Sequence, residues 1–297
     1  MKRVLTAVVL IPVVLLAVFR APMWLLLSLI GVVALLATQE YLHLAAKFGA
    51  RPFSKTVLAL TGLVFAAPIL ITGWDDKFLY LAPLVLLLLV LAPYIFLVMA
   101  MRREHLKQTL PSVTFSLLAF PYVALPLLLL AFLRSSRSGW FLVLFVFVAV
   151  WTGDIAAYYA GKNLGRRPLA PRISPKKTWE GAVASVITSV LFSVLLSLYA
   201  PNLTAGLFRM HVLADGCAGP VLPPLWIAAL QALAINIAAQ LGDLVESMLK
   251  RGAEVKDSGS ILPGHGGVLD RIDALLLASP AAVLVFALTS QYLPFPL

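Results

Sequence analysis

Long apolar segments separated by short polar stretches run through this chain, and they limit what it can fold into. Of its 297 residues, 61% are hydrophobic and only 12% are charged, whereas a soluble domain has about 25% charged residues. Apolar runs of about 20 residues can cross a bilayer as helices, which satisfy their backbone hydrogen bonds internally. The sequence therefore predicts an all-α, polytopic transmembrane helix bundle.

The apolar runs predict nine spans. The first follows Met1-Lys2-Arg3 like a signal peptide, but no small-x-small cleavage site precedes Arg20, so we interpret it as a retained helix. We divide the chain into N-terminal, lipid-facing scaffold helices (1–135) and C-terminal helices whose cytoplasmic loops carry the site (136–297). The predicted helices lie near Val4–Phe19, Pro22–Leu44, Val57–Trp74, Leu79–Met101, Leu110–Leu133, Trp140–Gly161, Gly181–Ala200, Val221–Leu249 and Arg271–Leu293.

The basic residues orient the bundle. With the N-terminus in the cytoplasm, the loops on that side hold 18 of the 23 Lys and Arg residues, and the opposite loops hold 5. This asymmetry obeys the positive-inside rule and accounts for much of the net charge of +10, so no nucleic-acid partner is needed. We expect a multi-pass protein of the inner (plasma) membrane, with a cytoplasmic site and an outside C-terminus. The cytoplasmic loops are 1–3, 45–55, 102–109, 162–180 and 250–271. The long opposite loop, 201–220, is interpreted as a solvated connector.

Carboxylates inside apolar spans are costly and commonly mark a site. Asp154 lies in the sixth predicted helix, and Asp243 and Glu246 share one face of the eighth because they are three residues apart. A helix-end ion pair with the lysine one turn later is the alternative interpretation. The polar stripe continued by Asn236 and Gln240 favours carboxylates that face the bundle.

Asp270 and Asp273 open the last predicted helix, where an acid at the N-cap and another at N3 also suit a capping box. Asp243 and Asp257 lie on the adjoining helix and loop. An oxygen-only set suits Mg²⁺ better than zinc, and Mg²⁺ is usually held by one or two carboxylates with substrate phosphates. Acids from two helices could form such a site.

Basic residues in two cytoplasmic loops predict phosphate binding. Lys176 and Lys177 precede the seventh helix, whose N-terminus Thr178 could cap, and a helix N-terminus with two lysines can bind an anion. In the other loop, glycines around His265 would let backbone N–H groups approach phosphate. Neither a Walker A nor a Rossmann motif is present. Anchoring to anionic headgroups is the alternative, and we prefer it for Lys162, Arg166, Arg167 and Arg172.

These polar positions resemble the signature of the phosphatidate cytidylyltransferase family, the CDP-diacylglycerol synthases. The main pattern is Ser247-x₂-Lys250-Arg251-x₄-Lys256-Asp257-x-Gly259-x₂-Leu262-Pro263-x-His265-Gly266-Gly267-x₂-Asp270-Arg271-x-Asp273. Upstream, Gly153-Asp154-x₂-Ala157-Tyr158 and Ser174-Pro-Lys-Lys-Thr-x-Glu-Gly181 are also similar. The resemblance covers roughly 151–273, while the first five helices match only in being apolar. It implies an integral membrane enzyme that is Mg²⁺-dependent, uses CTP and phosphatidate, and is commonly homodimeric.

The implied reaction joins two polyanions, which requires charge neutralisation and alignment more than a protein nucleophile. We assign catalytic roles to Asp243, Asp270, Lys256 and Arg271. The candidate Mg²⁺ ligands are Asp243, Asp270, Asp273 and Asp257, and this many acids could hold a second cation. The candidate phosphate-binding residues are Lys176, Lys177, Lys250, Arg251 and His265.

Two other functions fit the same residues less well. A transporter of a phosphorylated solute would place its charges near mid-span and show related halves, whereas these charges gather at one face. A polyprenol kinase using CTP, or a synthase acting on ether-linked isoprenoid lipids, would differ only in the acceptor. An alcohol phosphotransferase would need an Asp-Gly-x₂-Ala-Arg element, which is absent.

Overall fold

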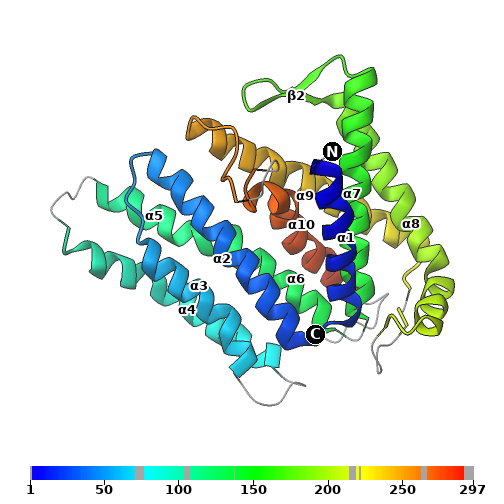
Figure 1. The fold of residues 1–297 in the computed structure, drawn as a ribbon, viewed down its shortest axis with the longest axis horizontal. Coiled ribbons are helices and arrows are strands. Elements are labelled where there is room, and N and C mark those ends of the chain that lie inside the picture. The colour runs from blue at the N-terminus through cyan, green and yellow to red at the C-terminus, as the bar shows by residue number, and fades with distance from the viewer. Residues whose placement is uncertain are drawn as a thin grey trace. The chain divides into compact units, whose positions relative to one another are not determined.

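A computed structural model of the chain describes residues 2–70, 77–103, 108–136, 138–213, 219–220, 222–261 and 266–290. This part is almost entirely helical and has a helix at each of the nine predicted positions (Figure 1). The helices are α1 (Lys2–Arg20), α2 (Met23–Lys47), α3 (Ser54–Leu70), α4 (Lys77–Ala100), α5 (Thr109–Ala119), the π-helical turn η2 (Phe120–Ala124), α6 (Leu125–Ser135), α7 (Gly139–Leu164), α8 (Trp179–Arg209), α9 (Leu225–Gly252) and α10 (Leu269–Leu288). Together α5, η2 and α6 occupy the fifth predicted position.

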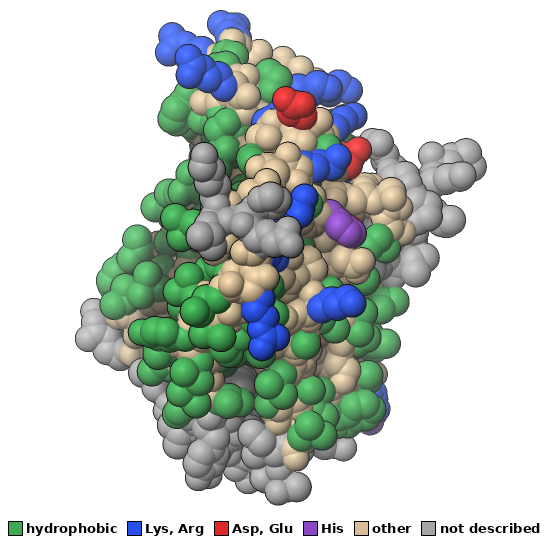
Figure 2. Space-filling model, turned by 90° about the vertical axis from the view of Figure 1, so that its left-hand side faces the viewer, with side chains coloured by type: hydrophobic (Ala, Val, Ile, Leu, Met, Phe, Trp, Pro, Cys, Tyr) green, Lys and Arg blue, Asp and Glu red, His purple; other side chains and the backbone are tan. Residues whose placement is uncertain are grey.

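Seven helical stretches of the described chain are long and apolar enough to cross a membrane. Two further apolar helices, Ile11–Arg20 and Ser54–Leu70, are shorter. Apolar side chains cover much of the surface in Figure 2, as expected where helices face lipid. A polytopic helix bundle is thus confirmed, whereas nine spans and the orientation stay predictions. The seven stretches are Met23–Lys47, Ala82–Ala100, Thr109–Ser135, Gly139–Leu164, Trp179–Arg209, Leu225–Gly252 and Leu269–Leu288.

The chain forms two compact units, which we describe separately. The α7–α8 unit comprises 1–21, 129–248 and 273–297, and the α2–α5 unit comprises 22–128 and 249–272. Helices α9 and α10 therefore each contribute residues to both units. The predicted division into 1–135 and 136–297, with the site in the second part, stays a prediction.

Close packing of α7 on α8 dominates the α7–α8 unit. A row of buried serines at every fourth position of α8 lets the helix backbones approach closely. Helix α8 also continues through Pro201 to Arg209, so the predicted loop 201–220 is wrong over its first nine residues. The helical spacing of buried Ala200, Thr204 and Leu207 maintains the packed face, and a proline is tolerated in such a bundle.

The predicted loop 162–180 contains a small antiparallel hairpin, β1 (Pro168–Ala170) and β2 (Ser174–Thr178), which sequence analysis did not predict. The Ser-Pro step favours the extended backbone that this pairing requires. Directly after β2, the Thr178 hydroxyl accepts a hydrogen bond of 3.2 Å from the Gly181 N–H and caps α8, as predicted. The hairpin therefore fixes Lys176 and Lys177 at the start of α8.

In the α2–α5 unit, α2 packs against α3, α5 and η2. Two serines of α5 fix the turn between α2 and α3: Ser112 accepts from the Arg51 N–H and Ser116 from the Phe53 N–H, each at 2.9 Å. Tyr41 of α2 packs against Tyr122 with ring centroids 5.5 Å apart. These contacts order the α2 face that carries the buried Glu40.

Candidate active site

A cavity of about 560 Å³ opens in the α7–α8 unit. Its walls come from α7, the hairpin, the first turn of α8, and α9. The volume falls within the range of about 300–1,000 Å³ that is usual for small-molecule sites. The polar residues of the lining are Asp154, Tyr158, Lys162, Lys176, Lys177, Thr178, Gln240 and Asp243.

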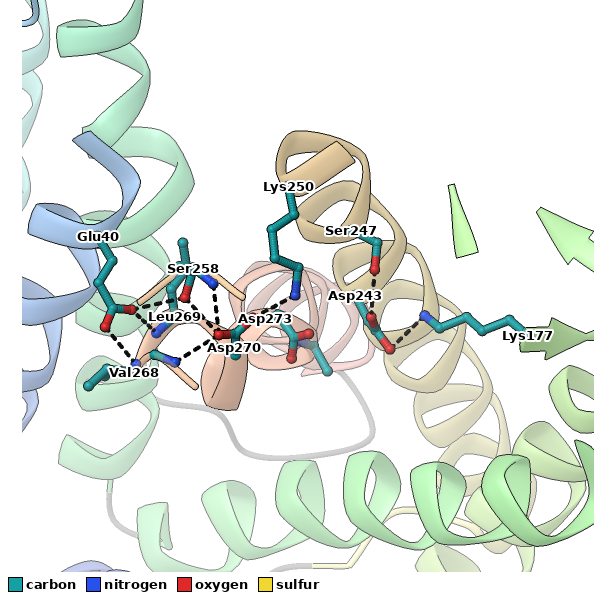
Figure 3. A network of polar contacts seen from close by, with 12 residues as sticks. Glu40, Lys177, Asp243, Ser247, Lys250, Ser258, Val268, Leu269, Asp270 and Asp273 are labelled. Carbon is teal, nitrogen blue, oxygen red and sulfur yellow. Dashed lines mark hydrogen bonds and ion pairs between the residues drawn. The ribbon is translucent and has the colours of Figure 1, made fainter. Parts of the chain in front are cut away.

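One ion pair spans this cavity. Lys177 Nζ of β2 lies 2.5 Å from Asp243 Oδ2 of α9, and the two side chains are 27% and 33% exposed (Figure 3). The Ser247 hydroxyl donates to Asp243 Oδ1 at 3.4 Å. Asp154 of α7 also lines the cavity, where it is repelled by Asp243 and attracted by Lys177. The cavity thus presents two carboxylates around one lysine, and both carboxylates remain accessible.

Below the cavity, a buried amide network joins three helices. Asn236 Nδ2 of α9 donates to the Ala149 carbonyl of α7 at 3.2 Å and to Ser185 Oγ of α8 at 3.1 Å. Gln240 Nε2 donates to Asn236 Oδ1 at 2.7 Å. A Cβ at Gly153 would collide with the Asn236 amide and the Ser185 hydroxyl, so any larger residue there would displace this network. The prediction that the α9 polar stripe faces the bundle is confirmed, and Glu246 is also buried.

A second polar cluster lies in the α2–α5 unit around Asp270, in the first turn of α10. Lys250 Nζ lies 2.6 Å from Asp270 Oδ1. Asp270 Oδ2 accepts from the Ser258 N–H and hydroxyl, both at 2.9 Å, and from the Gly267 N–H at 2.8 Å (Figure 3). Gly266 has a positive φ of 80°, and a Cβ there would meet Asp270 Oδ2. Ser258, Gly266 and Gly267 therefore lie closely around one carboxylate. The contact between Lys250 and Asp270 is not among the predictions, and the predicted roles of phosphate binding for Lys250 and Mg²⁺ ligation for Asp270 stay predictions.

The other predicted site residues are partly buried or exposed where the structure describes them. Asp273 is partly buried and accepts at Oδ1 from the N–H of the next residue, Ala274, at 2.7 Å. His265 lies outside the described residues. The remaining four side chains are exposed, and their predicted roles stay predictions: Arg251, Lys256, Asp257 and Arg271.

Carboxylate oxygens are the donors that this protein could offer to a metal. Asp154 and Asp243 line one cavity, and one or two carboxylates completed by substrate phosphates are a usual Mg²⁺ site. Among the described residues, no three His, Cys, Asp or Glu side chains form a ready metal group. The donor chemistry therefore fits a cation that arrives with phosphates, and the four-acid ligand set stays a prediction.

Two residues were missed as members of the site. The sequence indicates that Asp154 is a carboxylate within a span, but the predicted site does not include it, although it lines the cavity. The predicted site also omits Glu40, because residues 1–135 are interpreted as scaffold. Glu40 accepts from the Ser258 hydroxyl and from the Val268 and Leu269 N–H groups. A carboxylate in an apolar span is the signal that could have identified both residues.

Fold and site define a helical membrane protein whose buried and half-buried acids are paired with lysines. A sequence profile described as the cytidylyltransferase family matches residues 1–289, and the chain belongs to this family. It is 31% identical over 233 residues to a phosphatidate cytidylyltransferase of Rickettsia bellii. The aligned region covers 77% of this chain and 90% of that protein.

Matches to two other proteins of that name are shorter but closer in sequence. The Haemophilus influenzae protein is 40% identical over 162 residues, covering 54% of this chain and 51% of its own length. The Brucella melitensis protein is 39% identical over 171 residues, with 57% and 56% covered. The resemblance inferred from the sequence signature is confirmed at the level of the family.

Proposed function

We propose that this protein is a phosphatidate cytidylyltransferase, an integral membrane enzyme that condenses CTP with phosphatidate to give CDP-diacylglycerol and pyrophosphate. Family membership and the names of its relatives support this activity. The observation that carries the proposal is the accessible Lys177–Asp243 pair in a cavity that also holds Asp154 and Lys176. Such a site can exchange an internal ion pair for contacts with a polyphosphate.

The chemistry needs little from the protein beyond charge and alignment. An ionised oxygen of the lipid phosphate attacks the α-phosphorus of CTP, a new P–O bond forms, and the bond to the β-phosphate breaks. Pyrophosphate leaves with that electron pair, and no proton transfer to a protein base is required. Lys176 and Lys177, at the capped N-terminus of α8, would hold phosphate oxygens. Orientation of the two polyanions would then supply most of the catalysis.

Mg²⁺ would neutralise phosphate charge when it is bound. Asp243 is the first candidate ligand, with Asp154 in the same cavity and with Asp270, Asp273 and Asp257 as the predicted further acids. A second cation is part of the proposal. So are homodimerisation, an inner-membrane location with the site facing the cytoplasm, and entry of phosphatidate from the surrounding lipid.

Labelled nucleotides test the activity and separate it from its nearest alternative. Purified protein in detergent is mixed with Mg²⁺, CTP, and either phosphatidate or a polyprenol. With label on the α-phosphate, radioactivity should move to the lipid fraction only when phosphatidate is present. Transfer from γ-labelled CTP to polyprenol would instead identify a lipid kinase. Absence of a CMP-bearing lipid with phosphatidate would overturn the proposal.

A further inference from the structure

Glu40 is a buried carboxylate in the C-terminal part of the apolar helix α2. It is 2% exposed, and its neighbours on the same face of α2, Ala37 and Leu44, are buried too. An ionisable side chain in such a position is unfavourable unless its oxygens are satisfied. Its presence in α2 therefore requires a specific set of partners.

Those partners come from the segment that carries the sequence signature. Glu40 Oε1 accepts from the Val268 N–H at 3.0 Å, and Oε2 accepts from the Leu269 N–H at 2.8 Å. These N–H groups belong to the start of α10, which begins at Leu269, and the first N–H groups of a helix lack partners within the helix. Glu40 thus caps α10 from a position 229 residues away in the chain.

The same contacts bring Glu40 next to the donors of Asp270. The Ser258 hydroxyl lies 3.0 Å from Glu40 Oε2 and 2.9 Å from Asp270 Oδ2. Gly267, whose N–H donates to Asp270, directly precedes the Val268 N–H that donates to Glu40. Figure 3 shows Glu40 and Asp270 on either side of this backbone. One short stretch of chain therefore positions both carboxylates.

Two glycines of the signature fit around Glu40. A Cβ at Gly259 would meet the Glu40 carboxylate, and a Cβ at Gly267 would meet that carboxylate and the Ser258 hydroxyl. The sequence suggested that the glycines around His265, which include Gly267, admit phosphate. At these two positions the structure gives another reason, which is close packing of the loop on Glu40.

We propose that Glu40 is a positioning residue for the cytidylyl transfer, acting through Ser258 and the start of α10 to hold Asp270 in its working orientation. This inference rests on the proposed function. Without the Glu40 carboxylate, the Val268 and Leu269 N–H groups lose their acceptor and the loop rearranges. Asp270 then keeps Lys250 but loses the fixed Ser258 and Gly267 donors.

The test compares Glu40→Gln with the wild type in detergent. The Gln amide has nearly the same size, but its NH₂ group would face N–H donors. We expect kcat to fall about 100-fold and the Mg²⁺ concentration for half-maximal activity to rise about 10-fold, with KM for phosphatidate within about 3-fold. Glu40→Asp, which keeps the charge, should recover part of kcat. Thr38→Val, a buried substitution in the same helix, is the matched control and should retain activity.

Hydrogen exchange supplies a readout that does not need turnover. The Val268 and Leu269 amides should be protected in the wild type and in Thr38→Val, and should exchange faster in Glu40→Gln. If the wild type protects these amides but transfers no CMP, the proposed function fails while the Glu40 contact stands. Wild-type kcat and Mg²⁺ dependence in folded Glu40→Gln would overturn the positioning role. An equal loss of activity and folded protein, with unchanged kcat per folded molecule, would also overturn it.

Discussion

The two acid–lysine clusters of this protein differ in how firmly their carboxylates are held. In the cavity of the α7–α8 unit, Lys177 and Asp243 are about one-third exposed. In the α2–α5 unit, Lys250 and Asp270 are 14% and 6% exposed, and Asp270 also accepts three hydrogen bonds from the loop. A partly exposed pair can exchange its partner for a ligand at small cost, whereas a buried, fully bonded carboxylate has a set orientation. The cavity is suited to binding and the Asp270 cluster to preorganisation.

The largest effect is expected in the cavity. Asp243→Asn should reduce CMP transfer about 10²–10³-fold, because it removes a charge from the site while the shape is kept. Its thermal unfolding midpoint should stay near that of the wild type, since the Asp243 side chain is one-third exposed and is bonded mainly through one ion pair. Near-normal activity at saturating Mg²⁺ would contradict the assignment of Asp243 as a metal ligand.

Asp270→Asn should also abolish most activity, but it should destabilise the protein as well. The Asn amide nitrogen would face either Lys250 or the donors of the loop, which leaves buried polar groups without partners. The expected loss is about 2–4 kcal/mol in the free energy of unfolding. Thermal unfolding of both Asn variants measures the contrast. Equal stability of the two variants would remove the distinction between an adaptable and a preorganised cluster.

Lys177→Gln should act mainly on substrate binding. Loss of a charge-assisted contact to phosphate should raise KM for CTP about 10-fold, with a smaller effect on kcat. Steady-state kinetics at varied CTP measures both parameters. Arg172→Gln, an exposed position between the two hairpin strands, is the matched control and should leave KM unchanged. An unchanged KM in Lys177→Gln would mean that Lys177 serves only as the partner of Asp243.

The smallest effect on catalysis is expected beneath the cavity. Gly153→Ala places a methyl group against the Asn236 amide and should destabilise the α7–α8 unit by about 1–3 kcal/mol. Turnover should fall only a few-fold, because Gly153 does not itself line the cavity. Thermal unfolding and kcat of this variant measure the two effects. An unchanged unfolding midpoint would contradict this prediction and would mean that the Asn236 amide network accommodates the added methyl group without a loss of stability.

Local features of the site could be read from the sequence. Hydropathy located the helices, because a long apolar segment in lipid satisfies its backbone hydrogen bonds internally only as a helix. The Thr178 cap and the shared face of Asn236 and Gln240 depend only on spacing of three or four residues. These features were predicted because each depends on residues that are neighbours in the chain.

Features that depend on distant segments could not be read in this way. The sequence suggested that Asp270 was a helix cap or a metal ligand, but not that Ser258 and Gly267 would surround it. Nor could it show that α8 would continue through Pro201, since the packing face of the helix outweighs one proline.

By itself, the sequence determined the class of protein, the places of its helices and the residues with chemistry to offer. Only the tertiary structure decided that Lys177 meets Asp243, that Lys250 meets Asp270, and that Glu40 caps α10. Helical period and hydropathy depend on residues that are close in the chain, so they can be predicted from the sequence alone. The partner of a buried charge depends on which helix faces pack together, and that choice is made by the fold as a whole.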